Sequence, residues 1–122
     1  YCTGIPMMKE RLAMARYVFI ESRDPFESND TQFVTETVTA LKQLGHQVTV
    51  FLIQNGALAA RRNARVSHLR RLAAAGVELL ADDFSLRERG VTAAEMGDGI
   101  RESNIEALVD LLIQEETKAI WH

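Results

Sequence analysis

The chain has 122 residues, of which 47% are hydrophobic and 25% are charged, and its formal net charge is -3. This length fits one domain of roughly 100–200 residues, and the composition excludes a disordered, collagen-like or coiled-coil protein. The negative charge argues against a dedicated nucleic-acid binder, which is usually basic. No stretch approaches the roughly 20 apolar residues of a membrane span, so we expect neither nucleic acid nor a membrane as a partner.

We expect the first 14 residues to lie outside the folded domain. Residues Lys9–Arg11 are charged where a secretory signal peptide has its apolar core, so we expect a cytoplasmic protein. Because the chain does not begin with Met, we interpret residues 1–14 as a terminal arm or as a segment foreign to the native protein. Residues 15–122 then form the domain. The single cysteine, Cys2, excludes an intramolecular disulfide and a cysteine-rich zinc site.

The first half of the domain alternates strand and helix. An apolar run at Tyr17–Ser22 predicts a buried strand. Asn29 with Gln32 resembles a capping box that starts a helix, and Gly45 is expected to stop it. The apolar stripe of this helix consists of Val34, Val38, Leu41 and Leu44. A second strand follows at residues 48–53, ending at Asn55–Gly56. Its apolar side chains occupy both faces, which is typical of a strand covered on both sides in a parallel sheet.

The alternation continues to the carboxyl end. A second helix is expected from about Arg62 to Ala75, with Val66, Leu69 and Ala73 facing inward. Val77–Ala81 reads as a third strand. Two patterns resemble capping boxes, Ser85 with Glu88 and Thr92 with Glu95, and each predicts the start of a short helical piece.

The last elements are shorter. A brief fourth strand is expected at Gly99–Glu102, and a fifth at Lys118–Trp121. Between them, Ser103 with Glu106 predicts the cap of a final helix. The expected inward face of this helix consists of Ile105, Leu108, Val109 and Leu112.

This order of elements predicts an α/β fold, because alternating strands and helices form a parallel sheet through right-handed crossovers. We expect five parallel strands with helices on both faces. In such sheets the functional crevice lies beyond the carboxyl ends of the strands. Three expected loops meet there: Arg23–Asp30, Asn55–Arg61 and Asp82–Ser85.

Three segments carry a resemblance to a known family. ESRDPFESNDTQFV, ALKQLGHQVTVFLIQNG and LAAAGVELLADDFSLRERGV occur in an order and spacing that resemble the DsrE/DsrF-like family of small sulfur-relay proteins, from about Tyr17 to the carboxyl end. The resemblance implies a single flavodoxin-like domain and assembly into homo- or hetero-oligomers, often trimers or hexamers. It also implies that sulfur-carrying members hold a persulfide on a cysteine after the third strand, in some members with a second cysteine three residues later.

The sequence departs from the family at this cysteine. Counting back from the glycine of the Arg-Gly pair, Gly90, the position of the cysteine falls on Asp82 and that of the second cysteine on Ser85. A persulfide requires a thiolate, which neither a carboxylate nor a hydroxyl replaces. The resemblance therefore favours a non-catalytic subunit that acts in a sulfur relay as a structural partner. It implies contacts with further copies, a cysteine-bearing paralogue or an acidic sulfur-carrier protein, and no cofactor.

An acidic loop offers an alternative function. Asp82, Asp83 and Ser85, together with Asp24, could bind a cation or a small ligand, since hard cations take carboxylate oxygens. The competing interpretation makes both aspartates of the loop solvated residues and Ser85 a helix N-cap. No histidine has the spacing of a metal ligand, so no zinc site is expected.

Two further groups of polar residues each have two possible roles. Arg23, Asp24 and Asn29 border the first crossover and could bind an anion at a helix N-terminus, or only shape a loop and contact a neighbouring subunit. Asn55 follows the second strand and completes the expected site. Arg61, Arg62 and Arg65 belong to a stretch without acids and could dock an acidic partner, or pair with acidic residues of a neighbouring subunit.

Overall fold

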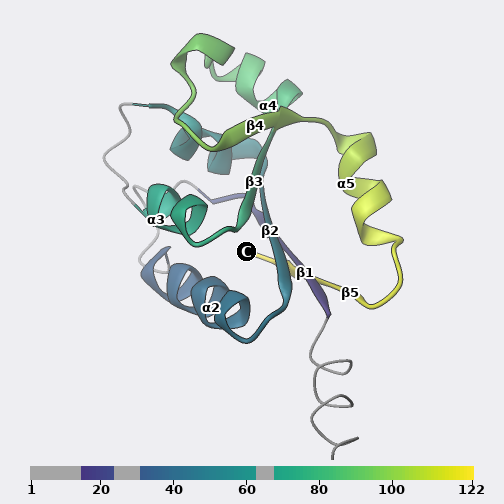
Figure 1. The fold of residues 1–122 in the computed structure, drawn as a ribbon. Helices are drawn as coiled ribbons and strands as arrows, with labels where there is room; N and C mark the ends of the chain where they lie inside the picture. The colour runs from purple at the N-terminus through teal and green to yellow at the C-terminus, as the bar shows by residue number, and fades with distance from the viewer. Residues whose placement is uncertain (1–14, 24–30, 63–67) are drawn as a thin grey trace, which may run out of the picture.

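A computed structural model describes residues 15–23, 31–62 and 68–122, which fold around one five-stranded sheet (Figure 1). The strands are β1 (Arg16–Glu21), β2 (Gln47–Leu52), β3 (Glu78–Asp82), β4 (Ile100–Ser103) and β5 (Thr117–Trp121). They lie in the order β4-β3-β2-β1-β5, and every neighbouring pair is parallel. The predicted α/β fold with a parallel sheet of five strands is confirmed.

Helices cover both faces of the sheet, as the sequence predicts. The helical elements are α2 (Thr31–Gln43), η1 (Gln54–Ala60), α3 (His68–Ala74), α4 (Asp83–Glu88), η2 (Ala93–Glu95) and α5 (Ile105–Leu112). The chain steps from β1 to β4 with its connections on one face, and α5 then returns along the other face to β5 beside β1 (Figure 1). Right-handed crossovers require this arrangement, because the direction of travel across the sheet reverses after β4. Among the described helices, none is long and apolar enough to cross a membrane.

The core has two parts, one on each face of the sheet. The larger part contains Val50 of β2 with side chains of α2, α3 and α4, and the smaller part contains Phe51 of β2 with Leu108 of α5. Val50 and Phe51 are 1% and 0% exposed, so β2 is covered on both faces as expected. The stripe of the first helix is shorter than predicted. The helix ends at Gln43, and Leu44 lies beyond it and is exposed.

Two expected elements have different bounds in the structure. The expected loop at Asn55–Arg61 is largely the 3-10 helix η1, whose small residues Ala57 and Ala60 are fully buried. Arg62, the expected start of the second helix, lies in a turn. The described part of that helix begins at His68, and Leu69 is buried as predicted, while Val66 lies outside the described residues.

Of the four predicted capping boxes, the first has its cap residue, Asn29, outside the described residues, and two of the other three are wrong. Thr92 and Glu95 do form the predicted box at η2. Ser85 lies inside α4, and the cap of that helix is Asp82. The cap of α5 is Asn104 rather than Ser103, and its Oδ1 accepts a hydrogen bond from the Ala107 N–H at 2.9 Å. The sequence offers two cap-forming residues at each of these places, and a shift of a few residues decides between them.

The inward face of α5 also differs from the prediction. Leu108 is buried, and Leu111 and Leu112 pack against the same part of the core. Ile105 and Val109 were expected to face inward, but about half of each side chain is exposed. Together with Ile113 they form an apolar stripe along the helix, at i, i+4 and i+8, that no described residue covers.

Candidate functional site

A cleft opens at the carboxyl ends of β2, β3 and β4. The chain leaves β3 through α4 on one face of the sheet and leaves β4 through α5 on the other, and parallel sheets bind ligands where the connections diverge in this way. The volume of the cleft is about 700 Å³. Its walls come from Gln54 after β2, from residues 82–89 around α4 and from Asn104–Glu106 at the start of α5.

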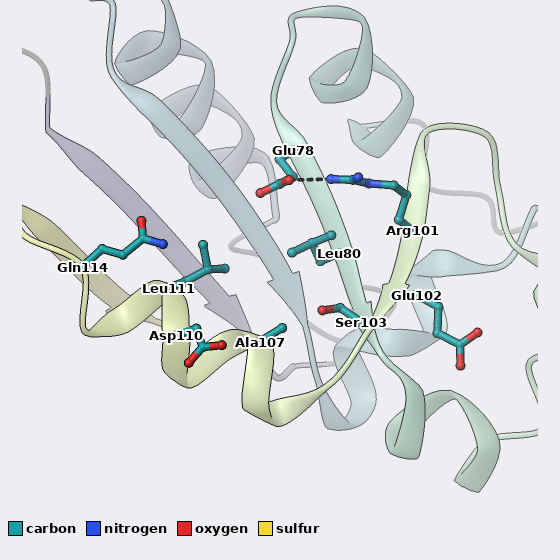
Figure 2. A pocket seen from close by; sticks show the side chains of 9 residues that line it. All are labelled: Glu78, Leu80, Arg101, Glu102, Ser103, Ala107, Asp110, Leu111 and Gln114. Carbon is teal, nitrogen blue, oxygen red and sulfur yellow. Dashed lines mark hydrogen bonds and ion pairs between the residues drawn. The ribbon is translucent and has the colours of Figure 1, made fainter.

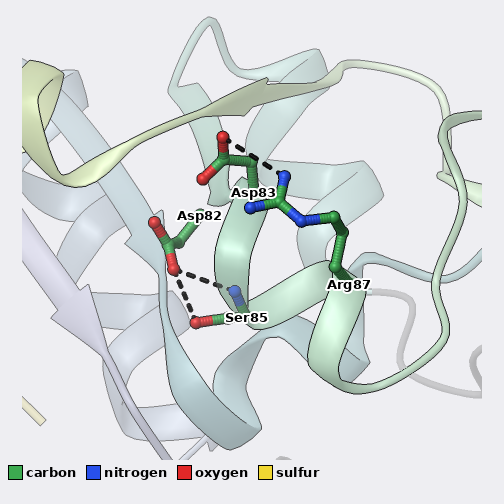
Figure 3. A network of polar contacts seen from close by, with 4 residues as sticks. All are labelled: Asp82, Asp83, Ser85 and Arg87. Atoms are coloured by element: carbon green, nitrogen blue, oxygen red, sulfur yellow. Dashed lines mark hydrogen bonds and ion pairs between the residues drawn. The ribbon is translucent and has the colours of Figure 1, made fainter.

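The floor of the cleft contains a buried hydrogen-bond network (Figure 3). Asp82 and Ser85 are 5% and 3% exposed. The backbone N–H and the hydroxyl of Ser85 both donate to Asp82 Oδ2, at 2.9 Å and 2.7 Å. The backbone N–H of Gln54 donates to Ser85 Oγ at 2.8 Å. This chain of hydrogen bonds ties the end of β2 to the start of α4, and hydrogen bonds to an ionised carboxylate are among the stronger ones.

Gln54, whose N–H joins this network, has an uncommon backbone conformation. Its φ is 54°, in the left-handed region that non-glycine residues rarely occupy. The strand β2 ends there, and the chain turns into η1 beneath the cleft. Gly56 follows, and a Cβ at this glycine would lie 2.1 Å from the carbonyl oxygen of Glu21 in β1. The close approach of the two backbones therefore requires glycine, and it fixes the floor of the cleft against the centre of the sheet.

Arg89 forms one wall of the cleft, although no sequence pattern predicted it as a site residue. Its Nε and Nη2 donate to Asn55 Oδ1 at 3.2 Å and 3.0 Å, and its Nη1 donates to the Ser85 carbonyl at 3.3 Å. The predicted site residue Asn55 thus joins the site by holding this guanidinium. The pair Arg89-Gly90, from which the position of the family's cysteine is counted, was the sequence feature that could have indicated Arg89.

The mouth of the cleft combines acidic and apolar side chains. Asp83 forms an ion pair with Arg87 at 3.6 Å, on the surface of α4. Phe84 and Ile105 are 61% and 52% exposed, although both are large and apolar. An exposed aromatic beside a polar floor is typical of a surface that another molecule covers.

A second groove of about 350 Å³ lies between α5 and the β3–β4 edge of the sheet (Figure 2). Leu80 and Leu111 face it, and Arg101 Nη2 donates to Glu78 Oε2 at its rim. The other oxygen of Glu78 accepts a hydrogen bond from the Thr49 hydroxyl at 3.0 Å. The rim charges of Glu78 and Arg101 already pair with each other, so the larger cleft is the better candidate site.

The start of the first crossover is occupied by the end of the chain. The backbone N–H and hydroxyl of Ser22 donate to the His122 carbonyl at 2.8 Å and 3.1 Å. His122 Nδ1 lies 3.3 Å from Glu21 Oε2, and both side chains are largely buried. Burial raises the pKa of Glu21, although His122 and Arg23 act in the opposite direction. Polar groups at the end of β1 therefore hold β5 in place.

Comparisons with known proteins agree with this architecture. The model of the DsrE/DsrF-like family matches residues 15–119. The chain belongs to the DsrE/DsrF-like family. The fold is similar to that of the YchN protein from E. coli, with a TM-score of 0.80, 16% identity, and coverage of 89% of this chain and 100% of that one.

A further solved structure of this DsrE-like fold is a protein of unknown function, MTH1491, from Methanobacterium thermoautotrophicum. It has a TM-score of 0.67 and 20% identity, and the match covers 88% of this chain and 99% of that one. Identities this low show the shared fold alone. Among proteins of curated function, no match to the sequence is found.

In this DsrE/DsrF-like chain, the two positions that the resemblance assigns to cysteines carry the buried network. Asp82 ends β3, and Ser85 lies one turn into α4. The interpretation of Asp82 as a solvated loop residue is therefore wrong, as is that of Ser85 as the N-cap. Asp83, in contrast, is partly exposed as that interpretation expects.

The other predicted site residues that the structure describes, Arg23, Arg61 and Arg62, do not line the cleft. Arg23 is exposed at the end of β1, while Asp24, Asn29 and Arg65 lie outside the described residues. Arg61 is half-buried, and its Nε donates to the Leu58 carbonyl at 3.3 Å; Arg62 is exposed. Within the described ranges, no group of three His, Cys, Asp or Glu residues is placed to hold a metal ion.

Proposed function

We propose that this protein is a non-catalytic DsrE-like subunit that acts in sulfur transfer through contacts with other subunits in the cytoplasm. The observation that carries the proposal is the buried carboxylate of Asp82 at the position that sulfur carriers of the family give to a cysteine. Sulfane sulfur needs a thiolate, and the Asp82 side chain is already engaged as the cap of α4. The partner is a further copy of this chain or a cysteine-bearing paralogue.

The exposed apolar side chains of the described structure support a role in assembly. Val109 on α5 and Ile113 directly after it are 50% and 74% exposed, and Trp121 on the edge strand β5 is 62% exposed. Large apolar patches on a soluble domain mark interaction surfaces. Docking of an acidic sulfur carrier on Arg61, Arg62 and Arg65 remains a prediction.

Two measurements test the proposal. Mass spectrometry of the chain and of its peptides, after incubation with a polysulfide donor, should find no stable gain of a sulfur atom at any residue other than Cys2. The native mass, measured with and without a cysteine-bearing paralogue from the same source, should show an assembly larger than one chain. A chain that stays monomeric in both samples, or that gains sulfur elsewhere, contradicts the proposal.

The volume of the cleft favours a second candidate function, a small-ligand binder. Ligand pockets span roughly 300–1,000 Å³, and this cleft of about 700 Å³ lies within that range. Its floor offers Asp82 and its mouth offers Asp83 beside an exposed aromatic ring. Divalent metals should then raise the melting temperature of the wild type, since hard cations take carboxylate oxygens. An equal rise in variants with both aspartates changed to alanine would eliminate this candidate.

A further inference from the structure

The cleft carries carboxylates that no described residue neutralises. Glu88 ends α4 and Glu106 lies in the first turn of α5; both are exposed, and no hydrogen bond or ion pair within the described ranges reaches either side chain. Asp82 is nine-tenths buried and uses Oδ2 for Ser85, and no described group donates to its Oδ1. Arg89 also lines the cleft and keeps its positive charge, since it donates to the neutral Asn55, but Asp82, Glu88 and Glu106 outnumber it. The cleft is thus a built site with unpaired negative charge.

The same chain carries arginines that no described residue pairs. Arg70 and Arg71 on α3 are exposed, and neither makes an ion pair or side-chain hydrogen bond within the described part of the chain. No acidic residue occurs between Gln54 and Glu78. Like charges gathered on one surface repel one another unless an opposite charge covers them. The chain therefore has two unpaired surfaces of opposite sign.

The apolar side chains at the mouth of the cleft suit a guanidinium better than an ammonium. Phe84 and Ile105 are both more than half exposed, next to the unpaired carboxylates. Arginine stacks its planar head on an aromatic face while donating hydrogen bonds to a carboxylate, and it is more weakly hydrated than lysine. An acidic partner, in contrast, would be repelled from this cleft.

We propose that the cleft of one copy receives the α3 arginines, Arg70 and Arg71, of a second copy. This inference rests on the proposed function and names the surfaces of the assembly. The two surfaces differ, so each copy offers its α3 to one neighbour and its cleft to the other. Such a head-to-tail contact generates a ring when the rotation between copies closes. The neighbour's guanidinium would complete the site, facing Asp82 Oδ1 beside Phe84.

Charge reversal on the full-length chain tests the two surfaces separately. Arg70→Glu with Arg71→Glu should dissociate the assembly, and Glu88→Lys with Glu106→Lys should do the same, because each creates like charges across the contact. We expect the dissociation constant to rise about tenfold or more in native mass spectrometry and sedimentation. A chain with all four changes restores opposite charges in every contact and should reassemble. Added salt should weaken the wild-type assembly.

Matched controls separate a lost contact from a lost fold. Glu36→Lys reverses an exposed carboxylate on α2 and should leave the native mass unchanged. Phe84→Ala should weaken assembly while far-UV circular dichroism stays native, because this ring is exposed in the single chain. If both double variants are folded and keep the wild-type mass, or if the fourfold variant stays dissociated, the inference is overturned while the proposed function stands. A wild type that is monomeric alone and with the paralogue overturns both.

Discussion

Replacing Asp82 by alanine tests whether the buried network of the cleft stabilises the fold. The change removes the cap of α4, which costs about 1 kcal/mol. It also leaves the Ser85 hydroxyl, 3% exposed, without its acceptor, and a buried unpaired polar group costs about 1–3 kcal/mol. The free energy of unfolding should therefore fall by about 2–4 kcal/mol. The melting temperature should fall by about 8–16 °C in a domain of this size.

Urea unfolding followed by far-UV circular dichroism is the suitable assay. Trp121 is 62% exposed and would be a poor fluorescence probe of the fold. The protein concentration must be equal in all samples, because assembly adds to apparent stability. Asp83→Ala is the matched control, since its ion pair with Arg87 lies on the surface and is worth less than about 1 kcal/mol. If the Asp82 variant loses no more stability than this control, the reasoning about the network is refuted.

Three further predictions concern the parts of the fold that position the cleft. Gly56→Ala should lower the free energy of unfolding by more than about 4 kcal/mol, because its Cβ would lie 2.1 Å from a backbone atom. Gly45→Ala should lower it by about 1–2 kcal/mol in urea unfolding, because its φ is +94° although no atom lies within 4 Å. Burial holds the pKa of Glu21 above its ordinary 4.5, so the folded chain binds this proton more tightly than the unfolded chain does. The resulting contribution to the free energy of unfolding is complete below about pH 4.5, and it is lost as pH rises through the raised pKa. Glu21→Gln should remove this loss, and a wild-type-to-variant difference that is the same at every pH would contradict it. Leu108→Ala should cost about 2–5 kcal/mol and Val109→Ala less than about 0.5 kcal/mol by the same assay; equal losses would show that α5 packs differently.

The fold could be predicted from the sequence because several independent sequence features indicate the same strands and helix ends. Strand β2 shows its burial through apolar residues at consecutive positions, and Gly45 and Gly76 both adopt positive φ at the predicted helix ends. The sequence could not predict in the same way which apolar residues of α5 are buried and which are exposed. Val109 and Leu108 are both apolar neighbours in the sequence, and only the position of the helix on the sheet decides which of them is buried.

The site was predicted in part. The resemblance placed attention on Asp82 and Ser85, and the structure puts both in the floor of the cleft. The direct hydrogen bond between them was missed, because each residue taken alone is a good helix cap. Arg89 was missed because its role depends on Asn55, which is distant in the sequence and near it only in the folded chain.

The position of β5 has a consequence for the protein while it is being made. Strand β1 lies inside the finished sheet, yet one of its two neighbours is the last strand of the domain, and the Ser22–His122 contact spans 100 residues. On a ribosome, β1 and β2 can pair early, but the outer edge of β1 stays without a neighbour until residues 117–121 emerge. An apolar strand with an open edge invites pairing with other nascent chains. The strand order therefore predicts that a chain truncated before residue 117 keeps β1 as an open edge strand and aggregates more readily.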